Sequence, residues 1–417
     1  MRKIVLSVEA TALVDLLAGR CAGLPDCVVD DEAGRQRFVS LCEAHAVQHL
    51  VAGLLRDGAG GVVPEEQIPL VTALEAGMDE RCALLMATES QLRALAEAME
   101  GGNTPFWLLK GVALIGTVYR ETPLRRLFGD ADILVPEEHF DRTVELCEGL
   151  GYRLAEHKRD IEAVRRYGHK LFFIPPYGRG CGLDIHFRPL GKKLFEPTAR
   201  IDCSVFRENT SECELAGRRF SVPAPELHLL YLCVHLSLQH HLASLGWQHD
   251  IRAFPAALPE LDWDRFVELA GTCRVRRAVW LSLEAASRIL DAEIPEGVTA
   301  ALRPAEPGLL TRLWCASWLD PANIVAKTHH FRQRSLPGKA ARMYSEVLLI
   351  DDDRERWSSV LKWFLPDPVF FRASYRVSGW WRLALCYLMH PVVVTAIVVM
   401  LAARSARYLV EYRTGSE

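Results

Sequence analysis

The sequence lacks several features that would indicate its function directly. None of its twelve cysteines forms a C-x-x-C pair, so the usual spacing of a structural zinc site is absent, and scattered single cysteines are typical of buried thiols in a reducing compartment. The formal net charge is only −4, so no basic field favours a nucleic-acid partner. The first residues carry no sustained apolar region with a cleavage site after it, and we therefore expect a cytoplasmic protein.

The composition is that of an ordinary globular protein with more than one domain. Of the 417 residues, 50% are hydrophobic and 24% are charged, which excludes wholesale disorder. Changes in pattern along the chain predict a helical region over 1–103, an α/β core over 104–222, a helical subdomain over 223–300 and a C-terminal helical region over 301–417.

The N-terminal region shows apolar residues at three-to-four spacing, which predicts helices. We expect these helices over 10–17, 35–55 and 68–99, and the last of them ends at the Gly-Gly-Asn sequence of residues 101–103. We interpret this region as a helical cap over the sheet.

Two aspartates separated by one residue mark the centre of the α/β core. Asp130 and Asp132 begin an apolar run, and in a strand their side chains point to the same face. An Asp-x-Asp sequence is also common in surface turns, so the motif alone does not decide its role. Its context favours a site, because a short apolar strand ends upstream at Lys110-Gly111 and a helical pattern follows. This turn offers a cation and backbone N–H groups to a phosphate.

A third aspartate lies in a predicted β-hairpin further along the chain. Residues 170–174 and 182–188 read as two strands joined by a Pro- and Gly-rich turn. In the second strand Asp184 and His186 share one face. If this hairpin lies beside the first strand, Asp184 joins Asp130 and Asp132, and three such carboxylates hold magnesium ions that clamp nucleotide phosphates.

These segments together resemble a known family. The run from Lys110-Gly111, through Arg126 and residues 130–135, to residues 183–186 is similar to the uncharacterised nucleotidyltransferase family of bacterial gene clusters for polysaccharides and modified peptides. That family belongs to the polymerase-beta-like nucleotidyltransferase superfamily. The strong similarity covers about a quarter of the chain, and it implies an α+β fold with a small mixed sheet between N-terminal and C-terminal helical regions.

The resemblance also implies a chemistry and a set of site residues. Asp130, Asp132 and Asp184 would be catalytic metal ligands for two Mg²⁺ ions. Lys110, Gly111 and Arg126 would bind the nucleoside triphosphate, such as ATP, whose nucleoside monophosphate is transferred to an acceptor.

One turn departs from the superfamily pattern. Lys110-Gly111 stands where the superfamily usually has Gly-Ser, whose hydroxyl helps to hold the phosphates. The acceptor stays open between a small molecule, a sugar, a peptide and a protein. Two other functions remain: a glycosyltransferase that uses Asp-x-Asp to hold a nucleotide sugar, and a non-catalytic accessory protein that retains the fold.

Histidines gather in the helical subdomain, at His235, His240, His241 and His249. Their spacings match no i, i+4 metal pair on a helix, so we favour polar positions of a subdomain that shapes the acceptor pocket over a zinc site.

The C-terminal region contains a long uncharged stretch. Residues 383–403 carry no acidic or basic side chain apart from His390, and aromatic residues and arginines flank them. This length could span a bilayer, the flanks would suit a helix pair in the membrane interface as a peripheral contact, and a buried helical hairpin is the third alternative.

Overall fold

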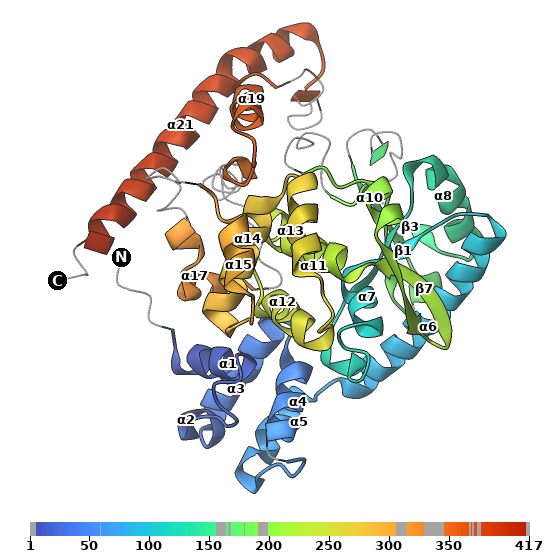
Figure 1. The fold of residues 1–417 in the computed structure, drawn as a ribbon, viewed down its shortest axis with the longest axis vertical. Coiled ribbons are helices and arrows are strands. Elements are labelled where there is room, and N and C mark those ends of the chain that lie inside the picture. The colour runs from blue at the N-terminus through green and yellow to red at the C-terminus, as the bar shows by residue number, and fades with distance from the viewer. Residues whose placement is uncertain are drawn as a thin grey trace.

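The structure is a computed structural model, shown in Figure 1. The residues that it describes are 6–58, 60–155, 164–165, 168–178, 180–190, 199–305, 315–328, 346–366, 368, 371–372 and 377–413.

A mixed five-stranded sheet lies at the centre of the α/β core. The strands are β1 (Trp107–Leu108), β2 (Asp130–Leu134), β3 (Arg153–Leu154), β4 (Lys170–Ile174) and β5 (Gly182–His186). Their order is β1-β2-β5-β4-β3, and β2 and β5 run parallel while the other neighbouring pairs are antiparallel. The β4–β5 hairpin therefore lies beside the aspartate strand, which was the condition for Asp184 to join Asp130 and Asp132. A separate hairpin pairs β6 (Thr210–Leu215) with β7 (Arg218–Pro223).

The two faces of the sheet have different neighbours. The face that carries Ala131, Ile133 and Leu183 packs into a core with α6 (Met78–Gly101) and α8 (Phe140–Gly149). Because side chains alternate along a strand, Asp132 and Asp184 lie on the opposite face. Helices surrounding the sheet confirm the α+β class that the resemblance implied (Figure 1).

A second and larger core joins the beginning of the chain to the helical subdomain. The N-terminal helices in this core are α1 (Val8–Leu17), α3 (Glu32–Ala44), α4 (Gln48–Gly58) and α5 (Ile68–Leu74). The helices that they share it with are α11 (Pro225–Val234), α12 (Leu245–Ala257), α13 (Trp263–Thr272), α14 (Arg276–Leu290) and α15 (Glu296–Leu302). Within the N-terminal region, α6 covers the sheet, whereas α1 and α3–α5 pack with the later helices. The domain boundaries stay a prediction.

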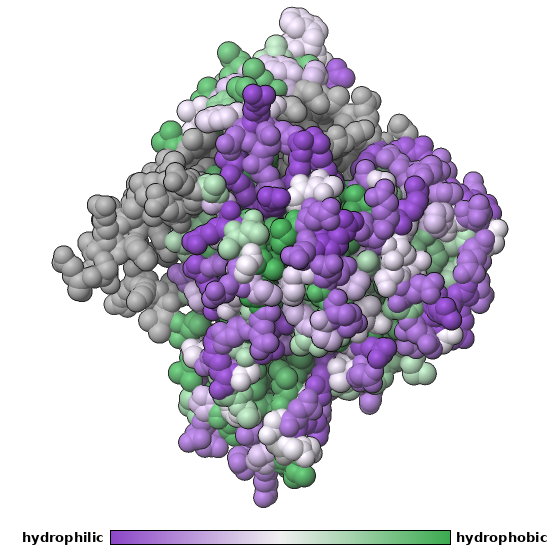
Figure 2. All heavy atoms as spheres, in the orientation of Figure 1, coloured by the Kyte–Doolittle hydropathy of each residue, from purple (hydrophilic) through white to green (hydrophobic). Residues whose placement is uncertain are grey.

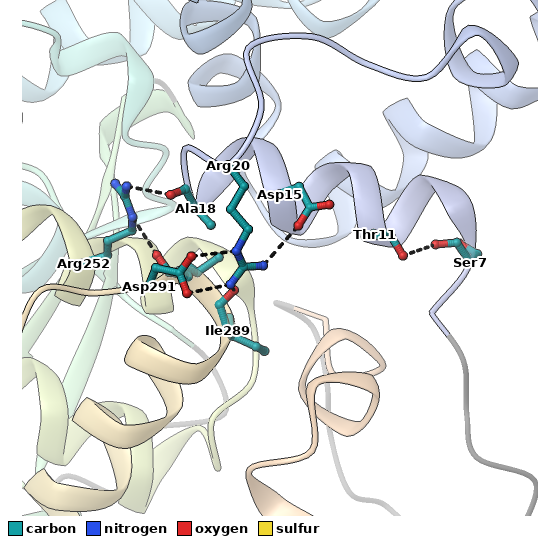
Figure 3. Close-up of polar contacts among 9 residues, drawn as sticks. Ser7, Thr11, Asp15, Ala18, Arg20, Arg252, Ile289 and Asp291 are labelled. Carbon is teal, nitrogen blue, oxygen red and sulfur yellow. Dashed lines mark hydrogen bonds and ion pairs between the residues drawn. The ribbon is translucent and has the colours of Figure 1, made fainter.

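Polar contacts at the end of α1 connect the same two regions (Figure 3). The Arg20 guanidinium donates to both carboxylate oxygens of Asp291, at 2.6 and 2.7 Å, and also contacts Asp15. Arg252 donates to the carbonyls of Ala18 and Leu290. These bonds link α1 to α12 and to the C-terminal end of α14.

Two of the predicted N-terminal helices are wrong as single helices. The helix expected over 35–55 divides into α3 and α4, which are bent by 119°, and Ala46 between them has a φ of 56°. The helix expected over 68–99 divides at Gly77, whose φ of 78° is in the left-handed region. A left-handed residue ends a helix, so the following residues begin a new one.

The uncharged C-terminal stretch lies within one helix, α21 (Trp380–Arg413), which includes Pro391. The helical hairpin considered for these residues is therefore wrong. Within the part of the chain that the structure describes, no single helix is long and apolar enough to cross a membrane, and α3 with α4 meets that test only as a bent pair.

Candidate active site

Three aspartates come together on one face of the sheet. Strands β2 and β5 are parallel and in a register that places Asp132 directly opposite Asp184. Neighbouring strands lie about 4.8 Å apart, so the two carboxylates are side by side. Asp130 lies two residues before Asp132 on the same face. The side chains of Asp132 and Asp184 are almost fully buried, and Asp130 is half-buried.

His186 completes a group with the chemistry of a metal site. Ligand atoms of Asp132, Asp184 and His186 all lie within 4.8 Å of one another. The His186 Nε2 atom is 2.8 Å from Asp132 Oδ1 and 3.8 Å from Asp184 Oδ2. Asp184 Oδ1 is buried and has no hydrogen-bond partner, an arrangement that is costly unless a cation or donor satisfies it. These residues fit a divalent cation, since carboxylate oxygens and imidazole are common ligands of such ions.

Two lysines approach the carboxylates from different elements. Lys110 is the first residue of α7 (Lys110–Gly116), and its Nζ atom is 2.6 Å from Asp132 Oδ1. The Leu109 N–H donates to the Asp132 carbonyl, which fixes the start of α7 beside β2. Lys170 forms an ion pair with Asp184 Oδ2. The site thus has two ammonium groups that can contact phosphate oxygens.

The electrostatics of the face follow from the crowding of like charges. Burial, together with the charges of Asp132 and Asp184, raises the pKa of Asp130 to about 7. Burial also opposes ionisation of Asp132, but Lys110 and His186 outweigh it and hold the Asp132 pKa below its usual range. Burial and the nearby Lys110 lower the pKa of His186. Added positive charge would favour the ionised form of Asp130.

Comparison with protein families identifies the group to which this site belongs. Residues 31–291, more than half of the chain, match the model of a family described as uncharacterised nucleotidyltransferases. The chain belongs to this family. It is therefore a transferase of the nucleotidyltransferase type, as the resemblance implied, and a nucleoside triphosphate is the substrate that the family implies.

Other comparisons add little. No curated protein matches the chain. The solution structure of the antibiotic-resistance factor ANT(2'')-Ia is similar over 45% of this chain and 91% of its own, with 15% identity and a TM-score of 0.32. A likeness this low carries no argument about the site.

In this nucleotidyltransferase, Arg126 lies in a buried network instead of pointing freely toward the carboxylates. Its Nε and Nη2 atoms donate to the two oxygens of Asp250, each at 2.7 Å, and its Nη1 atom donates to the Leu127 carbonyl. The Tyr119 hydroxyl donates to the same Asp250 at 3.0 Å and lies 3.0 Å from His249 Nδ1. The contacts of Arg126 suit a positioning role, and its contact with phosphate stays a prediction.

A second buried arginine supports the loop that leads to the aspartates. Arg81 of α6 donates to the carbonyls of Arg126 and Phe128, and its guanidinium lies 4.3 Å from the centre of the Phe128 ring. Burial, with the nearby charge of Arg126, lowers the pKa of Arg81 to about 10. Gly111 packs against the same loop: a Cβ atom there would lie 2.7 Å from Phe128 Cβ.

The histidines of the helical subdomain form no metal-ligand group among the described residues. His235 and His240 contact each other through their Nε2 atoms at 3.1 Å, and the His240 ring lies 3.8 Å from that of Trp247. The π-helix His235–Gln239 carries the first of them. The interpretation of these histidines as polar positions that shape the acceptor pocket stays a prediction.

Sequence reasoning did not assign a role to three residues of the site. The sequence did contain an indication for His186, because alternation along its strand places it on the same face as Asp184. Lys170 had a weaker one, as a cation at the start of a strand. Nothing local pointed to Asp250 as the partner of Arg126, which lies 124 positions away.

Proposed function

We propose that the protein transfers a nucleoside monophosphate from a nucleoside triphosphate to an acceptor hydroxyl, with divalent metal ions. The observation that carries this proposal is the register of β2 and β5, which sets Asp132 opposite Asp184, with His186 within reach of both carboxylates. Asp130, Asp132 and Asp184 are the proposed ligands of Mg²⁺, and His186 is added to them. When bound, the metal would neutralise triphosphate charge and polarise the reacting phosphorus.

The chain's own residues bind and orient the reactants. Lys110 and Lys170 neutralise the negative charge of the phosphates. Their ammonium groups are placed for this role because they lie beside the carboxylates that are the proposed metal ligands. The acceptor oxygen forms a bond to the α-phosphorus, the bond to the β-phosphate oxygen breaks, and pyrophosphate leaves with that electron pair. The proton of the acceptor hydroxyl passes to Asp184. Arg126 holds the loop before Asp130 through its pair with Asp250.

Two finer points rest on the resemblance alone. The first is the acceptor, which we expect to come from polysaccharide or modified-peptide biosynthesis. The second is the choice of Mg²⁺. Because magnesium favours oxygen ligands and His186 offers nitrogen, Mn²⁺ is the natural comparison.

The test is binding of ATP, GTP, CTP and UTP to the full chain by calorimetry, with Mg²⁺, with Mn²⁺ and without metal. The Asp132→Asn variant removes one charge from the site. Asp264→Asn is the matched control, since Asp264 is exposed in the first turn of α13. We expect metal-dependent binding of at least one nucleotide that Asp132→Asn abolishes and Asp264→Asn preserves.

Four other outcomes would count against the proposal. Nucleotide binding that needs no metal, or equal binding by Asp132→Asn, would mean that the carboxylates have no role in nucleotide binding. Binding of nucleotide sugars in place of triphosphates would indicate a glycosyltransferase. No nucleotide binding by the folded protein would indicate an accessory role.

A further inference from the structure

Over residues 380–396, whose side chains the structure describes, the buried positions of helix α21 lie on one side. The Tyr387 hydroxyl donates to the Pro366 carbonyl at 2.9 Å. The Phe371 ring packs edge-on against the rings of Tyr387 and His390, with centroids 4.7 and 5.2 Å away. His390 and Val394 are buried. These contacts also bring α21 against the end of α19 (Asp353–Phe364), which precedes Pro366.

The other side of α21 exposes a continuous apolar stripe, which we call the outer stripe. Its members follow one another at spacings of four, three, four and seven residues and therefore lie on one side of a helix. They are Trp381 at 55% exposure, Leu385 at 51%, Leu388 at 70%, Val392 at 61% and Val399 at 60%. Neighbouring α19 also exposes Trp357 and Leu361. Figure 2 shows apolar residues gathered at the upper end of the view, where Figure 1 places the start of α21.

A contiguous apolar surface of this kind indicates a binding site, because scattered single apolar residues are the usual pattern on a protein surface. With 34 residues, α21 is about 50 Å long, and it has no aspartate, glutamate, lysine or arginine between Leu383 and Ala403. The occupant must therefore be apolar over a long surface.

The charged residues of the segment that contains the stripe indicate which partner the stripe binds. From Pro368 to Val410 the sequence has no aspartate or glutamate. The same segment has five arginines, which are Arg372, Arg376, Arg382, Arg404 and Arg407. Helix α21 itself carries four arginines and a single acidic residue, Glu411, so a second copy of the helix would bring an excess of positive charge together. Coiled coils, in contrast, carry complementary charges beside their apolar seam. Anionic lipid headgroups complement arginines, and acyl chains complement the stripe.

We propose that the outer stripe of α21 binds the surface of an anionic bilayer, with the helix lying in the plane of the interface. The attached side of the helix is already occupied by Phe371 and Pro366, so the side that carries the outer stripe can enter the lipid. Trp380 and Trp381 are exposed at the start of the helix, and tryptophan is enriched at the headgroup level of membranes. This binding is independent of the proposed nucleotidyl transfer.

The test is co-sedimentation of the full chain with two kinds of vesicle. One contains phosphatidylcholine alone, and the other contains phosphatidylcholine with about 30% phosphatidylglycerol, which makes its surface anionic. The Leu388→Glu/Val392→Glu variant places two acidic groups in the outer stripe. Met86→Glu is the matched control, because Met86 of α6 is also 70% exposed. Circular dichroism and the unfolding midpoint confirm that each variant is folded.

We expect the intact chain and Met86→Glu to bind the anionic vesicles, and the double variant to bind them at least tenfold more weakly, with nucleotide binding in solution unchanged. No vesicle binding by the intact chain, or equal binding by the double variant, would overturn the proposal. A dimer that depends on Leu388 would replace the bilayer with a second copy, and resistance to extraction by alkaline carbonate would show a spanning segment instead of an interfacial one.

Discussion

Asp250 holds Arg126 through two parallel hydrogen bonds of 2.7 Å, and both side chains are almost completely buried. Asp250 belongs to α12 in the helical subdomain, whereas Arg126 lies in the loop four residues before Asp130. The pair therefore connects the large helical core to the carboxylate face. Arginine and carboxylate match geometrically in this arrangement, which fixes orientation as well as distance.

Removing one partner of this pair should destabilise the protein. Asp250→Asn leaves the Arg126 charge buried without its counter-ion, and breaking a buried pair in this way costs about 3–5 kcal/mol. We expect the free energy of unfolding, measured in urea, to fall by about that amount, and nucleotide affinity to fall with it because the loop before Asp130 loses its support.

The double variant provides the control. Arg126→Met/Asp250→Leu removes both charges together and leaves neither unpaired. We expect it to be more stable than Asp250→Asn, so that the effects of the two sites are not additive. Additive losses would show that the two side chains act separately.

Gly111 should not tolerate a side chain. The added Cβ of Gly111→Ala would lie 2.7 Å from Phe128 Cβ, so the Phe128 loop would have to move. Overpacking of this kind costs about 1–3 kcal/mol, and we expect loss of both stability and nucleotide binding.

Gly149→Ala is the comparison for Gly111→Ala. Gly149 ends α8, and an added Cβ would meet nothing within 4 Å. Replacing this glycine should leave stability unchanged or raise it by up to ~1 kcal/mol. If both variants behave alike in thermal unfolding, the close approach of Gly111 to Phe128 has no energetic consequence.

Two buried histidines should make the fold sensitive to mild acid. Burial lowers the pKa of His228 to about 3, and burial with the charge of Arg252 lowers that of His249 to about 3. An unfolded histidine has a pKa of about 6.5, so their contribution is complete above this pH and is lost as the pH falls toward 3. At pH 5 the loss is about 2 kcal/mol for each histidine.

His228→Leu tests this dependence. His228 Nε2 is buried without a hydrogen-bond partner, so the change removes a titrating group without breaking a bond to that atom. We expect the drop in unfolding free energy between pH 7 and pH 5 to be about 2 kcal/mol smaller in the variant. An identical drop in both proteins would mean that His228 is protonated in the fold.

The strands and the polar face could be predicted because they depend on local alternation. Asp130 and Asp132 are two residues apart, as are Asp184 and His186, so each pair must share a face wherever its strand lies. The role of His186 was missed because alternation identifies a face and not the atoms opposite it. Only the β2–β5 register places its imidazole beside Asp132.

Contacts between distant segments could not be predicted. Nothing in the sequence near Arg126 indicates that its partner is Asp250. Arg126 was therefore expected to bind the phosphates of the nucleotide. The breaks at Ala46 and Gly77 were missed because the helix on each side buries its own apolar side chains, so the spacing of apolar residues continues across the break.

Lys110 and Lys170 should affect metal and nucleotide in opposite directions. Each ammonium pairs with a carboxylate that is also a proposed metal ligand, Lys110 with Asp132 and Lys170 with Asp184. A cation alone must compete with the lysines for the carboxylates. A metal–nucleotide complex instead brings phosphates, which can form ion pairs with the displaced ammonium groups. We therefore expect Lys110→Met and Lys170→Met to bind Mn²⁺ alone more tightly and the nucleoside triphosphate at least tenfold more weakly, both measured by calorimetry. Arg120→Met, an exposed charge beyond the other end of α7, should change neither affinity. If the lysine variants lose affinity for Mn²⁺ as well, the site has been disrupted as a whole and the lysines have no separate role in phosphate binding.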